Sequence, residues 1–205
     1  MTTTPDPTVR LTDRKHAAIL EAAVAEFRAA GYEATSMDRI AARAGVSKRT
    51  VYNHFPGKEA LFVRILEEML ERGVCGPDLA YRPDRPLRTQ LLELVDQKLR
   101  LLHDPHFVDL ARVAIAAGIH SPELARTMLD QLGDREEGLT TWVVAAAADG
   151  RLKTDDPRFA AMQLQGLLKG FAFWPQLSMG QPPLDAAQEA QVAGSAVDMF
   201  LAYYA

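Results

Sequence analysis

The sequence of 205 residues has one cysteine, Cys75, and lacks a long apolar run. A lone thiol cannot form an internal disulfide, so we expect a protein of a reducing compartment, the cytoplasm. The longest stretch without a charge, residues 170–184, is interrupted by prolines and glycines. A membrane span needs about 20 apolar residues, and charged residues precede any apolar stretch near the start of the chain. We therefore expect neither a signal peptide nor a membrane partner.

Sequence signatures of catalysis are missing as well. The chain contains no Gly-x-Ser-x-Gly elbow, no Walker phosphate-binding loop and no glycine-rich dinucleotide turn. Serines, histidines and aspartates occur, but their order does not indicate a catalytic triad. These absences predict that the protein is not an enzyme, has no catalytic residues and needs no cofactor.

One short histidine motif has the residue types of a metal site. His103, His106 and Asp109 are spaced by three residues, and imidazole and carboxylate groups are ligands of zinc and related ions. Pro105 interrupts any helix between the two histidines, so the spacing defines no ligand geometry. We therefore expect a helix boundary with exposed histidines and no bound metal.

The alternation of apolar and polar residues that marks a half-buried strand is also lacking. Apolar residues instead recur every three or four positions along nearly the whole chain, which predicts an all-α fold. Hydrophobic residues make up 48% and charged residues 24% of the chain, which is typical of folded globular proteins. Thr12 or Asp13 is expected to cap the first helix, and Gly31 to end it.

Residues 35–58 are expected to form two short helices joined by a tight turn. Thr35 or Ser36 is a candidate N-cap, and Thr35 with Asp38 has the spacing of a capping box. Gly45 permits the left-handed backbone that a reversal needs, and Ser47 is the candidate cap of the next helix. The arrangement predicts a helix-turn-helix.

Basic residues are concentrated in this same segment. The whole chain has a net charge of -4, but residues 1–60 carry +2 and residues 61–205 carry -6. Between Arg39 and Lys58 there are five lysines and arginines and no acid. The phosphate backbone of a duplex favours such a patch through counterion release. We therefore expect binding to double-stranded DNA; the alternative is a helix pair whose surface charges are merely solvated.

The second helix of the pair offers side chains for both bases and backbone. Lys48, Arg49 and Asn53 have the reach for base edges in the major groove, and Thr50 for a thymine methyl. Residues near the end of this helix, and N–H groups at its start, are suited to phosphates. Asp38 either caps its own helix, which we favour, or accepts from a cytosine amino group. The predicted DNA-binding residues are Thr35, Ser36, Arg39, Ser47, Lys48, Arg49, Thr50, Tyr52, Asn53, His54 and Lys58.

The segment GYEATSMDRIAARAGVSKRTVYNHFPGKEALF, residues 31–62, resembles the amino-terminal domain of the TetR family of bacterial transcriptional regulators. The likeness covers about residues 13–65, with matches such as Gly45-Val46-Ser47 and Leu61-Phe62 in the family's spacing. It implies a homodimer with about nine helices per subunit: three form a homeodomain-like DNA-binding domain, the fourth links, and the rest bind a ligand and dimerise. The operator contacts that it implies are those of Thr50, Tyr52, His54 and Lys58.

Prolines and glycines between residues 73 and 86 mark the expected domain boundary. The chain is accordingly predicted to consist of a disordered arm (1–11), a helix-turn-helix domain (12–58), a linking helix (59–72) and a ligand-binding and dimerisation domain (73–205).

Two surfaces are expected in this last domain. Small residues spaced by four permit a close approach of helices, so the last two helices are predicted to form half of a four-helix dimer interface; the alternative is packing within one chain. Large apolar side chains with a histidine are candidates to line an effector pocket, and each is also a candidate core residue. The predicted interface residues are Gly166, Leu167, Gly170, Ala193, Val197 and Leu201. The predicted ligand-binding residues are His103, Phe107, Met128, Trp142, Met162, Phe171 and Trp174.

These features together predict a one-component transcriptional regulator. We expect a repressor that binds a pseudo-palindromic operator as a homodimer and is released by a small apolar or amphipathic effector. The alternative is a helical module that senses a ligand or a metal without operator-specific DNA binding.

Overall fold

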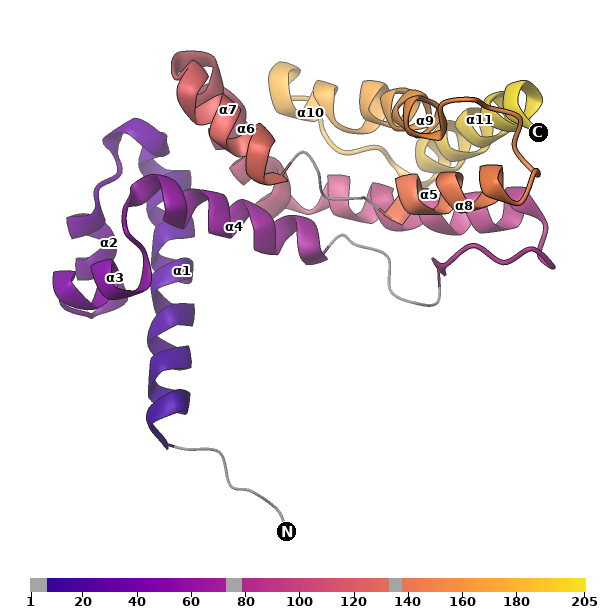
Figure 1. Cartoon of the computed structure of the whole chain (residues 1–205). Helices are drawn as coiled ribbons and strands as arrows, with labels where there is room; N and C mark the ends of the chain where they lie inside the picture. The colour runs from indigo at the N-terminus through magenta and orange to yellow at the C-terminus, as the bar shows by residue number, and fades with distance from the viewer. Residues whose placement is uncertain (1–6, 73–78, 133–137) are drawn as a thin grey trace, which may run out of the picture. The chain divides into compact units, whose positions relative to one another are not determined.

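The computed structural model describes residues 7–72, 79–132 and 138–205 (Figure 1). These residues form eleven helices and, within the same ranges, no strand, so the all-α prediction is confirmed. The count exceeds the expected nine for two reasons. A helix expected to run on from residue 122 is two helices, and a short helix follows the one that begins at Pro157. Cys75 lies outside the described residues.

The helices and their bounds are α1 (Pro7–Ala34), α2 (Met37–Ala44), α3 (Lys48–His54), α4 (Lys58–Arg72), α5 (Leu87–His103), α6 (Pro105–His120), α7 (Pro122–Leu132), α8 (Gly138–Ala148), α9 (Pro157–Ala172), α10 (Trp174–Met179) and α11 (Ala186–Tyr204).

The chain divides into two compact units that do not follow its order. One comprises residues 1–69 and 109–134, and the other residues 70–108 and 135–205. Most of α6 and all of α7 therefore belong with the amino-terminal helices. The boundary expected between residues 73 and 86 did not anticipate this, and the functional domains drawn from it remain a prediction. None of the helices in the described ranges has the length and hydropathy of a membrane span.

Helix α1 is longer than expected and is broken near its end. It begins at Pro7, within the segment 1–11 that was expected to be disordered; residues 1–6 lie outside the described part of the chain. Gly31 has φ 78° and ψ 175°, so the helical backbone is interrupted there. A left-handed φ carries no steric penalty at glycine, which explains why the break occurs at this residue.

The core of the first unit is built on the apolar stripe of α1. Ile19, Ala23 and Phe27 are fully buried, together with Ile40 of α2 and Val51 of α3. Their spacing on α1 places them on one side of the helix. Residues of α4, α6 and α7 complete this core. The packing holds α2 and α3 against α1 and so determines which side of α3 remains exposed.

The second unit is formed by α5, α8, α9, α10 and α11 (Figure 1). Helix α11 packs on both α5 and α9, and α8 packs on α9. Asp156 caps α9 by accepting from the backbone N–H of Phe159. Asp185 and Gln188 form a reciprocal capping box at the start of α11. These caps satisfy N–H groups that have no partner within the helix.

Candidate nucleic-acid interface and effector site

The turn between α2 and α3 is defined by two serine caps and one glycine. The Ser36 side chain accepts from the N–H of Arg39, and the Ser47 side chain accepts from the N–H of Thr50 at 3.1 Å. Gly45 ends α2 with φ 65° and ψ 29°, the left-handed conformation that the sequence led us to expect. Ser36 and not Thr35 is therefore the cap of α2, and the predicted capping box of Thr35 with Asp38 is wrong.

Helix α3 exposes one side and buries the other. Val51 is fully buried and Phe55, directly after the helix, is 5% exposed. Arg49, Tyr52 and Asn53 are exposed on the helix, Tyr52 by 52%. Residues three and four apart share a helix face, so these three side chains lie together. None of them makes an intramolecular polar contact within the ranges that the structure describes.

Most of the basic residues in this region are engaged within the protein. Lys48 pairs with Asp38 of α2, whose carboxylate is thus held by a side chain of α3. Lys58 donates to the backbone oxygens of Tyr32 at 2.8 Å and Glu33 at 3.3 Å, and its Nζ lies 4.3 Å from the centroid of the Tyr32 ring. Lys58 therefore binds carbonyls at the end of α1.

Glu26 of α1, which was not among the predicted residues, binds Arg39 and Arg43 of α2. Its Oε2 accepts from Nε of Arg39 and its Oε1 accepts from Nε of Arg43, each at 2.7 Å. Hydrogen bonds from Arg43 and Arg39 lower the pKa of the Glu26 carboxyl. A signal did exist: Glu26 falls on the apolar stripe of α1, where an acid needs a partner. Of the five basic residues from Arg39 to Lys58, Arg49 alone lacks an intramolecular partner in the described part of the chain.

Two further residues predicted to contact DNA are turned toward the protein. Thr35 is 2% exposed, and its hydroxyl donates to the backbone oxygens of Gly31 and Glu26. Its burial contradicts the predicted DNA contact, because the side chain is hydrogen-bonded to the backbone of α1. The ring of His54 is half-buried against that of His16 of α1, at a centroid distance of 5.5 Å.

The hydroxyls at the start of α3 also have internal partners. The Oγ of Ser47 and Oγ1 of Thr50 lie 2.8 Å apart, at hydrogen-bond distance. Ser47 is exposed and Thr50 is half-buried. The structure thus brings only part of the predicted set to the surface: Lys48, Arg49, Tyr52 and Asn53 are exposed on α3. Ser36, the cap of α2, and Arg39 of α2 are exposed as well.

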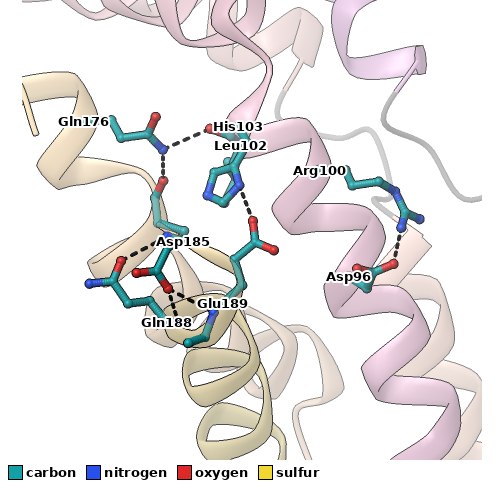
Figure 2. Close-up of polar contacts among 10 residues, drawn as sticks. Asp96, Arg100, Leu102, His103, Gln176, Asp185, Gln188 and Glu189 are labelled. Carbon is teal, nitrogen blue, oxygen red and sulfur yellow. Dashed lines mark hydrogen bonds and ion pairs between the residues drawn. The ribbon is translucent and has the colours of Figure 1, made fainter. Parts of the chain in front are cut away.

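His103 has the most distinctive environment among the predicted ligand-binding residues (Figure 2). It ends α5, its Nδ1 pairs with Oε1 of Glu189 on α11, and its side chain is 16% exposed. Its Nε2 is buried and has no hydrogen-bond partner among the described residues. If Nδ1 carries a proton that it donates to the carboxylate, a neutral ring presents Nε2 as an acceptor. The expectation of an exposed His103 is therefore wrong.

Gln176 and aromatic side chains lie in the same unit as His103. The Gln176 side chain is buried, and its Nε2 donates to the backbone oxygen of Leu102, the residue before His103, at 3.2 Å (Figure 2). Phe107 contacts Phe173, with ring centroids 6.1 Å apart, and Phe173 contacts Trp174. The end of α5, the start of α6 and helix α10 thus lie near one another and bring aromatic and polar groups together.

The other predicted ligand-binding residues do not join this neighbourhood. Met128 packs on the core of the first unit. Trp142 is 1% exposed, and its Nε1 donates to Oε1 of Gln90, so it is a core residue. Met162 and Phe171 are 67% and 60% exposed. A single pocket lined by all seven predicted residues is therefore wrong, because they belong to two cores and an outer surface.

Two residues of the histidine motif are engaged with separate partners. His103 pairs with Glu189, and Asp109 accepts from Nη2 of Arg28 at 2.6 Å. Within residues 7–72, 79–132 and 138–205, no three histidine, cysteine or acidic side chains are grouped to hold an ion. The carboxylate of Asp109 thus forms an ion pair with Arg28.

Helices α9 and α11 expose an apolar surface that differs in part from the predicted dimer seam. Gly166 and Gly170 are exposed and Leu167 is half-buried. Apart from the neighbouring residues of α9 itself, no heavy atom of the described residues lies within 4 Å of a Cβ placed on either glycine. Val197 is fully buried, so its predicted place in the seam is wrong because it packs inside its own chain. Ala193 and Leu201 are half-buried. The large apolar side chains exposed on the two helices are Phe159, Met162, Phe171, Met199 and Tyr203.

Comparison with known proteins gives two matches to family models. Residues 19–65 match the model described as bacterial regulatory proteins, tetR family. Residues 89–205 match the model described as the carboxyl-terminal domain of AefR-like transcriptional repressors. The two matches cover most of the chain, and the first contains α2 and α3.

Individual proteins agree with these matches. A crystal structure of a TetR family transcriptional regulator from Pseudomonas syringae is 50% identical, with a TM-score of 0.81 over 94% of this chain and 97% of that one. The flavonoid-responsive regulator FrrA is 30% identical, with a TM-score of 0.74 over 93% and 96%. The HTH-type transcriptional regulator RutR of Escherichia coli is 28% identical over 82% of this chain and 79% of its own length.

Proposed function

Because this chain belongs to the TetR family of bacterial transcriptional regulators, we propose that it is a one-component repressor that acts in the cytoplasm. It binds a pseudo-palindromic operator as a homodimer, and a small effector releases it. The family is one of transcriptional regulators, and we propose no enzymatic activity. The repressor assignment is supported by the match of residues 89–205 to a repressor domain.

The observation that carries operator binding is the exposed side of α3. Arg49 and Asn53 have the groups for hydrogen bonds to base edges, and Tyr52 beside them can reach a phosphate. Val51 and Phe55 fasten the opposite side in the core, so the exposed side chains are presented by a fixed helix. Lys48 joins this surface once a phosphate or a base competes with Asp38 for its ammonium group.

Dimerisation through α9 and α11 is supported by their exposed apolar surface. A groove of about 300 Å³ runs between them and is lined by residues that include Leu167, Phe171 and Met199. Contiguous apolar patches on monomeric proteins are small, and larger ones mark contact sites. Gly166 and Gly170 permit a close helix approach. We propose that a second copy covers this surface and thereby sets the spacing of the two α3 helices.

The proposed effector is aromatic and amphipathic. It binds beside His103, Phe107 and Trp174, with its hydroxyl donating to Nε2 of His103. Support comes from the unpartnered buried Nε2 and the neighbouring rings. The similar protein FrrA is described as a flavonoid-responsive regulator, and under this proposal the effector of the present protein belongs to the same chemical class as flavonoids. The effector lowers operator affinity only by binding the two conformations unequally, and couplings of about 1–3 kcal/mol are typical.

The test is a binding assay with DNA selected by the protein itself. Full-length protein is mixed with a random duplex library, and the enriched sequence is compared with a scrambled duplex by fluorescence anisotropy. We expect a pseudo-palindromic sequence, selective binding, and release by members of a flavonoid and quinone panel. If no sequence is enriched, the assignment as a DNA-binding regulator is overturned. If binding is selective but no compound of the panel reverses it, the proposal of an aromatic effector is overturned.

A further inference from the structure

The carboxylate of Glu26 is unusual in being buried and shared between two arginines. Glu26 is 5% exposed, although glutamate is seldom buried without a partner. Each of its oxygens accepts a single hydrogen bond, one from Arg39 and one from Arg43, both at 2.7 Å. Both hydrogen bonds lower the pKa of Glu26, so the group is ionised at neutral pH.

Both arginines meet Glu26 through Nε and remain open at the other end. Their side chains are 56% and 49% exposed, whereas that of Glu26 is 6% exposed. A guanidinium has five N–H donors, so one hydrogen bond through Nε leaves its two terminal amino groups available. Neither arginine side chain has another hydrogen bond or ion pair within the described ranges. The Glu26 carboxylate is thus buried, whereas the terminal amino groups of the two arginines are on the protein surface.

The two guanidinium groups lie on one face of α2. Arg39 and Arg43 are four residues apart, which corresponds to about 6 Å along the helix axis. The other face of α2 is buried through Met37, Ile40 and Ala41. Two like charges at this spacing repel one another, and an anion between them offsets the repulsion. Glu26 therefore stabilises a close pair of cations that α2 alone would disfavour.

Paired guanidinium groups with free terminal donors suit an oxyanion of the DNA backbone. Arginine binds phosphate with two parallel hydrogen bonds. The donors of its planar guanidinium group point in fixed directions, whereas those of a lysine ammonium group rotate. We propose that Glu26 is a positioning residue that holds Arg39 and Arg43 as a phosphate clamp beside α3. The inference rests on the proposed operator binding. It adds Arg43 as a DNA contact and gives the buried acid a role in recognition.

A purely structural role for the cluster makes different predictions. If Glu26 only ties α1 to α2, its loss changes stability and leaves the number of phosphate contacts unaltered. If it positions the clamp, its effect on DNA affinity depends on the two arginines being present. A double-mutant cycle separates these cases because it isolates the coupling between residues.

The experiment uses full-length protein and the duplex that it enriches from a random library. Dissociation constants are measured by anisotropy at several salt concentrations for wild type, Glu26→Gln, Arg43→Ala and Arg39→Ala/Arg43→Ala, and for Glu26→Gln in the last background. We expect Glu26→Gln to weaken binding about tenfold in the wild type and less than twofold in the double-arginine background. Arg43→Ala is expected to reduce the salt slope by about 0.9, which corresponds to one phosphate contact.

Controls distinguish a failure of the phosphate clamp from an effect on folding and from a failure of the proposed operator binding. Glu93→Gln is the matched variant, since Glu93 also holds an arginine, Arg85, through two hydrogen bonds, and it is expected to leave DNA affinity unchanged. An unaltered salt slope in Arg43→Ala, or an equal loss from Glu26→Gln in both backgrounds, would overturn the clamp alone. A wild-type protein that enriches no duplex would overturn operator binding and the clamp together.

Discussion

Arg49 and Asn53 are the exposed residues of α3 whose side chains match the hydrogen-bonding pattern of base edges. Tyr52 lies between them and offers one hydroxyl, which suits a phosphate. Under the proposed operator binding, Arg49 and Asn53 read the base sequence and Tyr52 sets the position of the helix on the duplex. This division makes the contributions of neighbouring side chains on one short helix separable by experiment.

Single substitutions on α3 are expected to differ in kind. Arg49→Ala and Asn53→Ala should each lower discrimination at particular base pairs by about 1–3 kcal/mol, because a lost base contact affects some sequences more than others. Tyr52→Phe should weaken all duplexes alike. Anisotropy against every single-base variant of the enriched duplex checks this, and a uniform loss from all three substitutions would contradict it.

The buried hydroxyl of Thr35 is expected to contribute to stability and not to recognition. Thr35→Val removes the donor to Gly31 and Glu26 and is expected to lower the free energy of unfolding by about 1–3 kcal/mol. Urea unfolding measures the change. Thr127→Val is the control, because that hydroxyl donates to Glu123 on an exposed part of α7, and a change within about 0.5 kcal/mol is expected there. Equal losses in the two variants would contradict the assignment.

Glu26 makes the stability of the first unit depend on pH. Its pKa in the folded protein is lowered below the ordinary value of 4.5 by hydrogen bonds from Arg43 and Arg39. A lowered acid pKa stabilises the fold above the unfolded value, and this contribution is lost as the pH falls through 4.5 toward the folded pKa. Urea unfolding between pH 7 and pH 3 should therefore give a flatter profile for Glu26→Gln than for wild type.

The comparison variant for the pH profile is Glu21→Gln, at an exposed position of the same helix. It is expected to keep the wild-type dependence on pH. If Glu26→Gln and wild type lose stability in parallel on acidification, the carboxylate does not contribute as described.

At the scale of single residues, the sequence predicted which part of the chain is basic but not which charges are free. The count from Arg39 to Lys58 treats all five cations alike. Glu26 precedes Arg39 and Arg43 by 13 and 17 positions, and only packing of α2 on α1 brings the acid to them. The orientation of Lys58 likewise depends on where α1 ends. Such contacts are set by tertiary structure: the position of Glu26 on the apolar stripe of α1 indicated that it needs a partner, but not which one.

At the scale of helices, local signals predicted most of the first unit. Gly31 and Gly45 interrupt helices where the sequence placed breaks, and Ser47 caps α3 as expected, because caps and left-handed turns depend on nearby residues. The second unit was less predictable. Its helices are apolar on more than one side, so periodicity could not distinguish Val197, which faces inward, from Met199, which is exposed.

The surface shared by α9 and α11 is the proposed dimer contact, and a pair of charges should disrupt it. Met199 and Tyr203 are 52% and 79% exposed, four residues apart on α11. Met199→Arg combined with Tyr203→Arg is expected to change the mass in solution from twice 22.6 kDa to the single-chain value, since unpaired charges cannot be buried between helices. Light scattering or sedimentation measures this.

Ile119→Arg is the matched control for the dimer, because Ile119 is 73% exposed but lies on α6. This variant should keep the mass of a dimer. A wild-type protein that is already a monomer, or a dimer that survives both arginines on α11, would contradict the proposed interface.

At the scale of the whole molecule, charge and contacts are distributed differently along the chain. The basic excess is confined to residues 1–60, whereas the first compact unit also takes in residues 109–134. The ion pair of Arg28 with Asp109 lies inside this unit and joins α1 to α6. The unit that carries α3 is therefore built from two separate parts of the chain, which no boundary signal in the sequence could reveal.

The proposed function depends on the exposed side of α3, which is proposed to bind a specific duplex through phosphates and base edges. The most direct test is the affinity of the full-length protein for its enriched duplex and for a scrambled duplex, measured across a series of salt concentrations. We expect selective binding that weakens steeply with salt, and a loss of the selectivity in Arg49→Ala/Asn53→Ala. Equal affinity for both duplexes, or an affinity that does not change with salt, would contradict it.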